Sequence, residues 1–499
     1  MTRKEKLFLN TLTAFIRQAI VIVCGFILPR QILLRYGNDV NGLVASITQF
    51  LSFISFLELG IGPVIQSNLY KPLAIGDEKG ISRVIKSSNN FFRKLALIFL
   101  GYIFILFFLY PNVVNDSFDF WFTASLVLII SISTFAEYYF GMTYTLLLNA
   151  DQKVYVQSIV NILIVLLNTI CCIVLIKMGC SIHIVKLISA LIFVLKPLFL
   201  NIYVSKKYCI DKSIVLSEEP IQQKWNGFAQ HLASTISNNI DIVLLTTFSS
   251  LVNVSIYSVY HTVTYGISNI ILLTVAGLES YWGNMIANGE NSTLIKSFDT
   301  IEYVMHITNT FIFSVTAIMI TPFVNIYISG VENAEMYNVP MFGTALVLSY
   351  FMMCLRIPYF RIIKASGHYK QTQNGSFISM GLNIVFSVLL VFKYDLMGVA
   401  IGTFIAFTFH TIYLAWYLQK NIINRPIKFF IKNLLTDILF FVVMFLISMN
   451  INLRAINYLE WIVDAIKVSV IGILILGIIS IMFYRKQVRQ LFLFIRNKT

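Results

Sequence analysis

Apolar stretches of about 20 residues recur along the whole chain, and short polar segments separate them. A stretch of this length lets an α-helix cross the hydrocarbon core of a bilayer. The pattern predicts about fourteen transmembrane helices. Their expected ranges are 8–28, 43–69, 92–110, 121–148, 155–177, 183–205, 226–248, 254–279, 304–327, 341–363, 373–393, 397–419, 433–449 and 461–484.

The composition supports the membrane interpretation. Hydrophobic residues make up 58% of the 499 residues, charged residues only 12%, and the mean hydropathy is +0.79. Because a soluble domain carries about 25% charged residues, this chain cannot cover a water-facing surface. Long apolar runs favour helices over the alternating strands of a membrane barrel. The predicted class is therefore an all-α integral membrane protein, with no loop long enough to form a soluble domain.

Lys and Arg residues lie mainly on one predicted face of the membrane. With the N-terminus in the cytoplasm, 27 of the 37 fall in cytoplasmic segments and six in outer loops. This bias follows the positive-inside rule and places both termini in the cytoplasm. The net charge of +14 is then a membrane-face charge near anionic lipid, so no nucleic-acid partner is expected.

Two halves of the chain share short matches at a nearly constant offset. VNGLVAS at 40–46 matches VNVSIYS at 252–258, and Lys153 corresponds to Lys370. Six spans separate the copies, so both enter the membrane from the same side and form a parallel pseudo-two-fold repeat, as in transporters. The expected organisation is an N-terminal lobe over 1–205 (spans 1–6), a cytoplasmic linker over 206–224, a C-terminal lobe over 225–420 (spans 7–12), and spans 13 and 14 with a basic tail over 421–499.

Three local motifs resemble a known family. They are the Tyr-Gly…Asn-Gly-Leu turn at 36–43, the Glu-Leu-Gly-Ile-Gly segment at 58–62, and the Leu-Tyr-Lys-Pro-Leu-Ala exit at 69–74. HLASTISNNIDIVLLTTF at 231–248 is similar to the family's seventh span. Together they resemble the Wzx-type polysaccharide flippases of the MOP superfamily, which also contains MATE exporters and lipid II flippases.

The resemblance implies a function and its partners. The substrate would be an undecaprenyl-diphosphate-linked oligosaccharide repeat unit, moved from the inner to the outer leaflet of a bacterial cytoplasmic membrane. The two lobes would act by alternating access, for surface polysaccharide biosynthesis. Membrane lipids and the polysaccharide polymerase machinery are the other partners that the resemblance suggests.

Three cations inside predicted spans are candidates for binding the diphosphate. Arg17, Lys196 and Arg356 lie seven to nine residues from the cytoplasmic ends of their spans, a depth of roughly 10–14 Å. Arginine matches phosphate oxygens with a planar fork of donors. Two other interpretations are open: Arg17 forms a structural pair with Glu58, and Lys196 extends along lipid toward the interface.

The segment around Glu58 combines an acid with helix-perturbing residues. Gly60, Gly62 and Pro63 follow Glu58 within five positions of one apolar run. The glycines would allow a neighbouring backbone to approach, and Pro63 would bend the helix. We expect this segment to act in gating or in ion pairing with Arg17.

Other polar residues are candidates for ion coupling. Asp241, Asn239, Glu137 and His261 lie in predicted spans and could bind a proton or sodium. Asp437 is a further intramembrane carboxylate. The driving force would be a proton or sodium gradient or the membrane potential. No cofactor, metal site or catalytic motif is expected, and no glycine-rich phosphate loop indicates ATP use.

Two alternative functions are weighed against the flippase. A MATE-like ion-coupled small-molecule exporter would share the fold, but twelve spans suit it better than fourteen. An integral membrane glycan polymerase or ligase would commonly need a large outer loop or a catalytic cluster at one face, and neither is present in the pattern. We therefore expect a transporter and not an enzyme.

Overall fold

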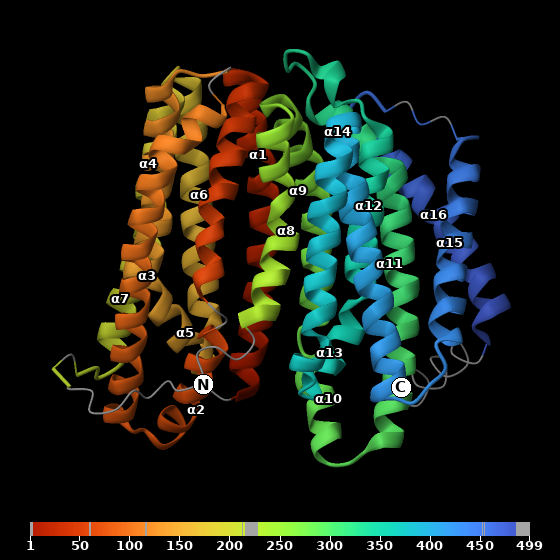
Figure 1. The fold of residues 1–499 in the computed structure, drawn as a ribbon, viewed down its shortest axis with the longest axis horizontal. Coiled ribbons are helices and arrows are strands. Elements are labelled where there is room, and N and C mark those ends of the chain that lie inside the picture. Colours follow the sequence, from red (N-terminus) through yellow and green to blue (C-terminus); the bar gives the residue numbers. More distant parts are fainter. Residues whose placement is uncertain are drawn as a thin grey trace. The chain divides into compact units, whose positions relative to one another are not determined.

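The structure is a computed structural model of the chain, and it describes residues 3–58, 61–114, 117–211, 213–214, 228–451, 453 and 455–485. Every regular element in these ranges is a helix (Figure 1). This confirms the all-α class that the apolar pattern predicts. Contacts divide the chain into two compact units, Met1–Ser258 and Val259–Thr499.

The helices follow one another with short connections. The first unit contains α1 (Arg3–Ser52), the 3-10 helix η1 (Phe53–Glu58), α2 (Ile61–Ile75), α3 (Glu78–Val113), α4 (Phe120–Ala136), the π-helix η2 (Glu137–Gly141), α5 (Met142–Ala150), α6 (Val154–Lys177), α7 (Ile182–Lys207), α8 (Phe228–Phe248) and the start of α9 (Leu251–Thr274). The second contains the rest of α9, α10 (Leu278–Ala287), α11 (Asn291–Tyr327), the 3-10 helix η3 (Ala334–Tyr337), α12 (Pro340–Leu355), α13 (Ile357–Ala365), α14 (Tyr369–Asn421), α15 (Lys428–Ser448) and α16 (Tyr458–Phe483).

Eleven helices in the described ranges are long and apolar enough to cross a membrane. Two of them are unusually long, with 52 residues in Glu5–Phe56 and 53 in Tyr369–Asn421. A straight helix of that length would extend about 78 Å, far beyond a hydrocarbon core of about 30 Å. Each contains a break between two predicted spans, with a φ of 83° at Gly37 and 44° at Asp395. The chain is a multi-pass membrane protein, and the total of fourteen spans stays a prediction.

α14 folds back on itself at Asp395. Ser387 Oγ donates a hydrogen bond to the Val399 carbonyl at 3.4 Å, and Ser376 Oγ lies 3.4 Å from His410 Nε2. In each pair the two residues lie on opposite sides of the break, and the second pair is farther from it. This is the contact pattern of two antiparallel helices. The two halves agree with the two spans that the sequence predicts for this region.

The predicted span at 43–69 is not one continuous helix. The α-helix ends at Ser52, a 3-10 turn follows, and α2 starts again at Ile61. The expectation that Pro63 bends a continuous helix is therefore wrong, because Pro63 lies in the first turn of α2. Backbone N–H groups there have no partner within the helix, so proline removes no hydrogen bond.

The last two helices pack on α11 within the second unit. Trp461 Nε1 donates to the Met319 carbonyl at 3.1 Å, and a Cβ on Gly472 would lie 3.0 Å from the Phe311 ring. Met319 and Phe440 belong to the apolar cluster that these helices share. α15 and α16 thereby bury one face against α11.

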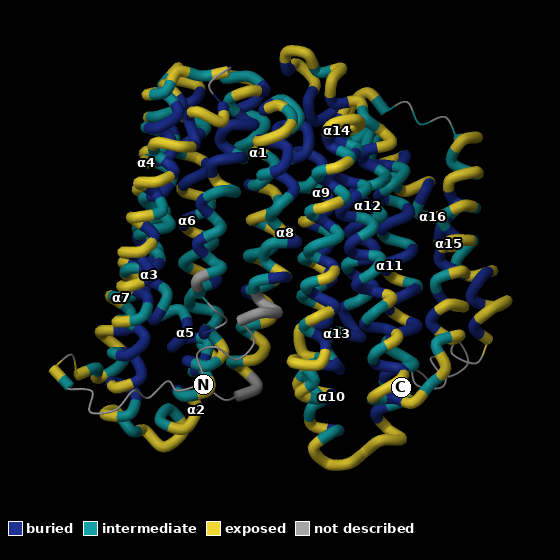
Figure 2. Tube along the Cα trace, in the orientation of Figure 1, coloured by how far each residue is buried: buried dark blue, intermediate teal, exposed yellow. Residues whose placement is uncertain are grey.

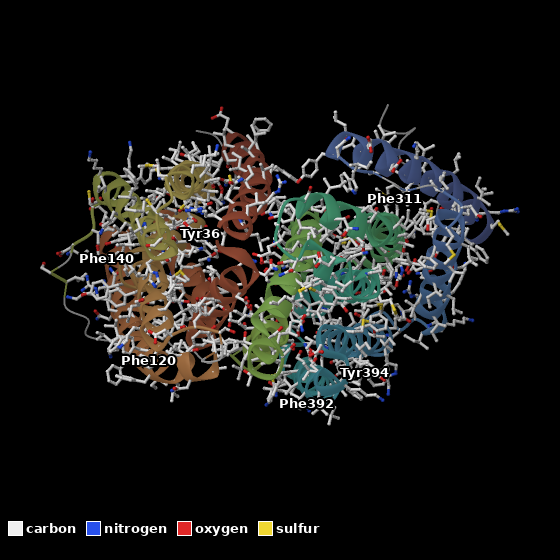
Figure 3. All side chains as sticks on the ribbon, turned by 90° about the horizontal axis from the view of Figure 1, so that it is seen from above. Tyr36, Phe120, Phe140, Phe311, Phe392 and Tyr394 are labelled. Carbon is white, nitrogen blue, oxygen red and sulfur yellow. The ribbon has the colours of Figure 1, made fainter. Side chains whose placement is uncertain are left out.

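Large apolar side chains cover the outward faces of the helices. Leu163, Leu389 and Phe392 are 62%, 65% and 69% exposed. Exposed and buried residues alternate along the helices in Figure 2, and Phe392 projects from the outer edge of the second unit in Figure 3. In water such faces would be unfavourable, whereas lipid tails solvate them.

Close packing inside the α14 hairpin predicts a specific stability effect. A Cβ on Gly402 would lie 2.2 Å from Ser387 Oγ and 2.6 Å from the Ser387 backbone nitrogen. We expect Gly402→Ala to destabilise the protein by about 1–3 kcal/mol, because the two helices must separate. The thermal unfolding midpoint in detergent measures this change.

Gly381→Ala is the matched control in the same hairpin. No atom lies within 4 Å of the Cβ that it would add. Alanine favours the helix by up to about 1 kcal/mol over glycine, so this variant should be unchanged or slightly more stable. Equal midpoints for the two variants would contradict the packing described here.

Candidate functional site

Glu137 and Lys196 form an ion pair inside the first unit. Lys196 Nζ lies 3.0 Å from Glu137 Oε1, and the two side chains are 23% and 26% exposed. Glu137 opens the π-helical turn η2, a helix irregularity that is frequent at functional sites. Gly141 ends that turn, and a Cβ there would lie 2.8 Å from the Pro197 side chain. The turn and α7 are therefore in close contact, and two residues predicted for separate roles neutralise each other.

Glu58 is held by a different residue from the one that the sequence suggests. The Tyr138 hydroxyl, one position into η2, donates a hydrogen bond to Glu58 Oε1. Within the described ranges no carboxylate forms an ion pair with Arg17, and the Arg17 Nε is buried without a hydrogen-bond partner. The predicted Arg17–Glu58 pair is therefore absent from the described structure.

The glycines beside Glu58 are only partly described. Gly60 lies outside the described residues. Gly62, at the start of α2, faces α5, and a Cβ there would lie 3.4 Å from Leu146 Cδ2. The close neighbour of Gly62 is thus a side chain and not a backbone.

Asn239 and Asp241 take part in a polar seam between α8 and its neighbours. Gln49 of α1 donates to Asn239 Oδ1 at 2.6 Å. The Tyr257 hydroxyl of α9 donates to Asp241 Oδ2 at 2.8 Å, and Asp241 is 4% exposed. These bonds satisfy polar atoms that would be costly to bury alone.

His261 lies among aromatic rings in the second unit. Its ring stacks on Tyr265 with a centroid distance of 5.3 Å and meets the edge of Tyr350 at 5.7 Å. His261 therefore contacts the aromatic rings of Tyr265 and Tyr350. Asp241, the other titratable candidate of this region, lies on the preceding helix, α8.

Arg356 occupies the junction between α12 and α13. Its Nη1 donates to His410 Nδ1 at 3.0 Å, and its guanidinium lies 4.8 Å from the centre of the Phe407 ring. No carboxylate forms an ion pair with Arg356 in the part of the chain that the structure describes. Its partners are thus a histidine and an aromatic face, and its positive charge is not neutralised by an acid.

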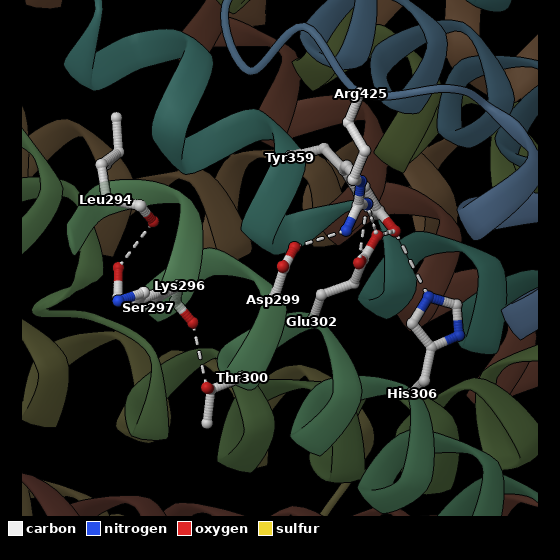
Figure 4. Close-up of polar contacts among 9 residues, drawn as sticks. All are labelled: Leu294, Lys296, Ser297, Asp299, Thr300, Glu302, His306, Tyr359 and Arg425. Atoms are coloured by element: carbon white, nitrogen blue, oxygen red, sulfur yellow. Dashed lines mark hydrogen bonds and ion pairs between the residues drawn. The ribbon is translucent and has the colours of Figure 1, made fainter. Parts of the chain in front are cut away.

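The most extensive charged network surrounds Arg425, which follows α14 (Figure 4). Its guanidinium lies 2.6 Å from Asp299 Oδ1 and 2.8 Å from both oxygens of Glu302. The side chains of Arg425 and Glu302 are only 12% and 3% exposed. The Tyr359 hydroxyl of α13 donates to Glu302 Oε1 at 2.6 Å.

The network continues through His306 to α15. His306 Nδ1 lies 2.6 Å from Asp437 Oδ2, and Thr310 donates to the other carboxylate oxygen at 2.7 Å. His306 Nε2 lies 3.3 Å from the Tyr359 hydroxyl, whose own proton points to Glu302. Both ring nitrogens of His306 thus have a polar partner within hydrogen-bond distance. The network joins α11, α13, α15 and the α14–α15 connection.

Sequence reasoning missed most of this network. Asp437 lies in a predicted span, but Arg425, Asp299 and Glu302 lie between the predicted spans. The signal that could have found them is the carboxylate itself, because an acid in a span requires a donor nearby. No group of His, Cys, Asp and Glu in the described ranges has the arrangement of a metal site.

The buried network predicts a large effect of removing one member. Arg425→Met leaves Glu302 buried without its cation, which we expect to destabilise the protein by about 3–5 kcal/mol. The double variant Arg425→Met/Glu302→Gln removes both charges and should recover part of that loss. Fluorescence-detected size-exclusion chromatography after heating measures both.

Arg361→Met provides the matched control. Arg361 pairs with Glu279 at 2.9 Å, but these side chains are 25% and 30% exposed. Solvent screens this pair, so its loss should change stability by about 0–1 kcal/mol. A loss as large as that of Arg425→Met would show that the depth of the network has no energetic role.

No protein-family model matches this sequence, and no curated protein matches it. Solved structures do. The lipid II flippase MurJ in an inward closed conformation aligns with a TM-score of 0.65 and 19% identity, over 96% of this chain and 100% of that one. A multidrug resistance MATE family transporter of the MOP superfamily aligns in its inward-facing conformation with a TM-score of 0.61 and 13% identity, over 81% of this chain and 94% of that one. An outward-facing MATE structure aligns with a TM-score of 0.54, 13% identity, and 81% and 95% coverage.

These likenesses establish the fold. Helices align along nearly the whole of this chain, and the identities are too low to carry more than architecture. The chain therefore has the fold shared by the MurJ flippase and by MATE transporters of the MOP superfamily.

Proposed function

We propose that this protein is a flippase for undecaprenyl-diphosphate-linked oligosaccharides. The observation that carries the proposal is Arg356, a cation at a helix junction whose partners are His410 and the Phe407 ring. A cation in a membrane span is unfavourable unless an anion or water stabilises it. A diphosphate supplies that anion when the substrate is bound, and the guanidinium fork suits its oxygens.

Arg17 is the second proposed contact with the diphosphate. Its side chain is partly exposed, and its Nε has no hydrogen-bond partner. A buried donor that the protein leaves unsatisfied gains a hydrogen bond if the bound substrate supplies an acceptor. Lys196 differs, because Glu137 neutralises it. Lys196 would reach the diphosphate only by exchanging this partner, which makes the pair a candidate trigger.

The share of the chain that each comparison covers supports a flippase over a MATE-like exporter. MurJ, named a lipid II flippase, aligns over 96% of this chain, whereas the two MATE structures described above align over 81%. In this chain α15 and α16 pack on α11 and are part of the second unit. A lipid-linked substrate is the chemistry that the longer match suggests.

The proposed mechanism is alternating access of the two predicted lobes, 1–205 and 225–420. The proposed gating segment contains Glu58, Gly60, Gly62 and Pro63. Ion coupling is proposed to involve four residues of the spans, namely Asp241, Asn239, Glu137 and His261. The proposed location is a bacterial cytoplasmic membrane, with both termini in the cytoplasm and polysaccharide polymerase machinery as a partner.

Charge reversal tests the proposed diphosphate contacts. Arg356→Glu and Arg17→Glu replace attraction for a diphosphate with repulsion, so we expect each to reduce surface polysaccharide export at least about tenfold, equivalent to about 1.4 kcal/mol. Membrane-inserted protein should remain near the wild-type amount. Extracted surface polysaccharide and quantitative immunoblotting measure the two.

Arg83→Glu is the matched control, since Arg83 is an exposed residue of α3 and makes no proposed contact. It should export normally. Full export by Arg356→Glu would remove the observation on which the proposal rests, and full export by Arg17→Glu would remove Arg17 alone from the site.

A deletion strain tests the function directly. Without the flippase, lipid-linked repeat units should accumulate on the cytoplasmic side, where an added glycosidase reaches them only in inverted vesicles. Unchanged polymer export in the deletion strain would contradict the flippase. Raised retention of small cationic dyes would indicate the exporter instead.

A further inference from the structure

A polar cavity lies within the first unit, at the end that the Lys and Arg distribution predicts to be cytoplasmic. Its volume is about 470 Å³, in the range of small-molecule sites. One face of α3 forms a wall, and the opposite walls come from η2, α5, α7 and the segment after α7. None of the residues predicted to bind substrate or ions lines it.

The cavity opens to the surface of the unit, because five of its lining residues are exposed, namely Asn90, Arg93, Phe140, Ser205 and Asp211. Only Ile85, Phe140 and Ile210 among its lining residues are apolar. The cavity is thus built for a polar occupant or for water.

Several lining groups have no protein partner in the described ranges. The side chains of Asn89, Asn90 and Asn201 make no hydrogen bond with another described residue. Arg93 has neither a hydrogen bond nor an ion pair there, and its guanidinium lies 5.2 Å from the centre of the Tyr139 ring. Stacking on an aromatic ring orients a guanidinium and leaves its donors available.

The remaining walls are held in place by their own contacts. The Asp211 backbone nitrogen donates to Ser82 Oγ at 3.0 Å. Tyr208 donates to Asp151 at 2.5 Å, and Lys153 lies 2.7 Å from the same carboxylate. Burial alone would raise the pKa of Asp151, but the bonds from Lys153 and Tyr208 outweigh it and lower that pKa. The cavity is therefore preformed.

The charges favour an anion that also carries hydroxyl groups. Lys86 and Arg93 are cations of the lining, and Asp211 is its single acid. Lys86 also donates to the Ile214 carbonyl, and Asp211 bonds to Ser213. Free amides both donate to and accept from hydroxyl groups.

We propose that this cavity binds a phosphate ester that carries hydroxyl groups. Arg93 contacts the phosphate, and Asn89, Asn90 and Asn201 contact the hydroxyls. The occupant is either the head group of a glycerophospholipid or a soluble polyol phosphate, since both have this chemistry. The site does not depend on the proposed transport function.

The test uses the full-length protein in phosphatidylcholine nanodiscs. One arm titrates glycerol 3-phosphate by calorimetry, and the other adds phosphatidylglycerol and counts retained lipids by native mass spectrometry. Arg93→Gln should weaken binding of the occupant about tenfold or more, because it removes a charge-assisted hydrogen bond. Arg83→Gln is the matched control, since Arg83 is an exposed arginine of the same helix that does not line the cavity.

The two arms distinguish the two possible occupants and can overturn the proposal. Arg93-dependent retention of phosphatidylglycerol alone assigns the site to a lipid head group, and Arg93-dependent binding of glycerol 3-phosphate alone assigns it to a soluble ester. Binding of neither probe, or equal weakening in Arg93→Gln and Arg83→Gln, overturns the proposal. Since neither arm measures flipping, a failure here leaves the flippase proposal intact.

Discussion

The structure depends on one constraint, which is that a charge inside a membrane bundle needs a partner. Most intramembrane charges here have one. Glu137 pairs with Lys196, and Arg425 joins Glu302 in a network that reaches Asp437 on α15. These contacts hold separate helices together, because each charge is stable only while its partner's helix stays in place.

Arg356 and Arg17 differ from these residues, because no acid among the described residues pairs with either of them. Arg356 contacts a histidine and an aromatic ring, and the Arg17 Nε has no partner. Within the described ranges the protein leaves the charges of these two arginines without an acidic partner, and this is the basis of the proposed diphosphate contacts. This contrast supports a substrate with a diphosphate more directly than the fold does, since the fold is common to transporters of different cargo.

Irregular backbone interrupts several helices of the protein. Asp395 turns α14 into a hairpin, Arg356 lies where α12 meets α13, and Glu137 opens a π-helical turn. Interrupted helices in membranes are tolerated where protein or a cavity satisfies the freed backbone groups. Two of these three breaks carry a residue of the candidate site.

The sequence alone determined the class, the approximate spans and the intramembrane charges, because hydrocarbon imposes a length and a composition that single residues reveal. It also identified two spans in α14, since the apolar run is interrupted there. Partners were decided only by the tertiary structure. Glu58 contacts Tyr138 instead of Arg17. Glu137 contacts Lys196, which lies 59 positions farther along the chain on another helix. Side-chain pairing between helices depends on their rotation and relative height, which local periodicity does not encode, and so Arg425 and its network could not be read from the pattern.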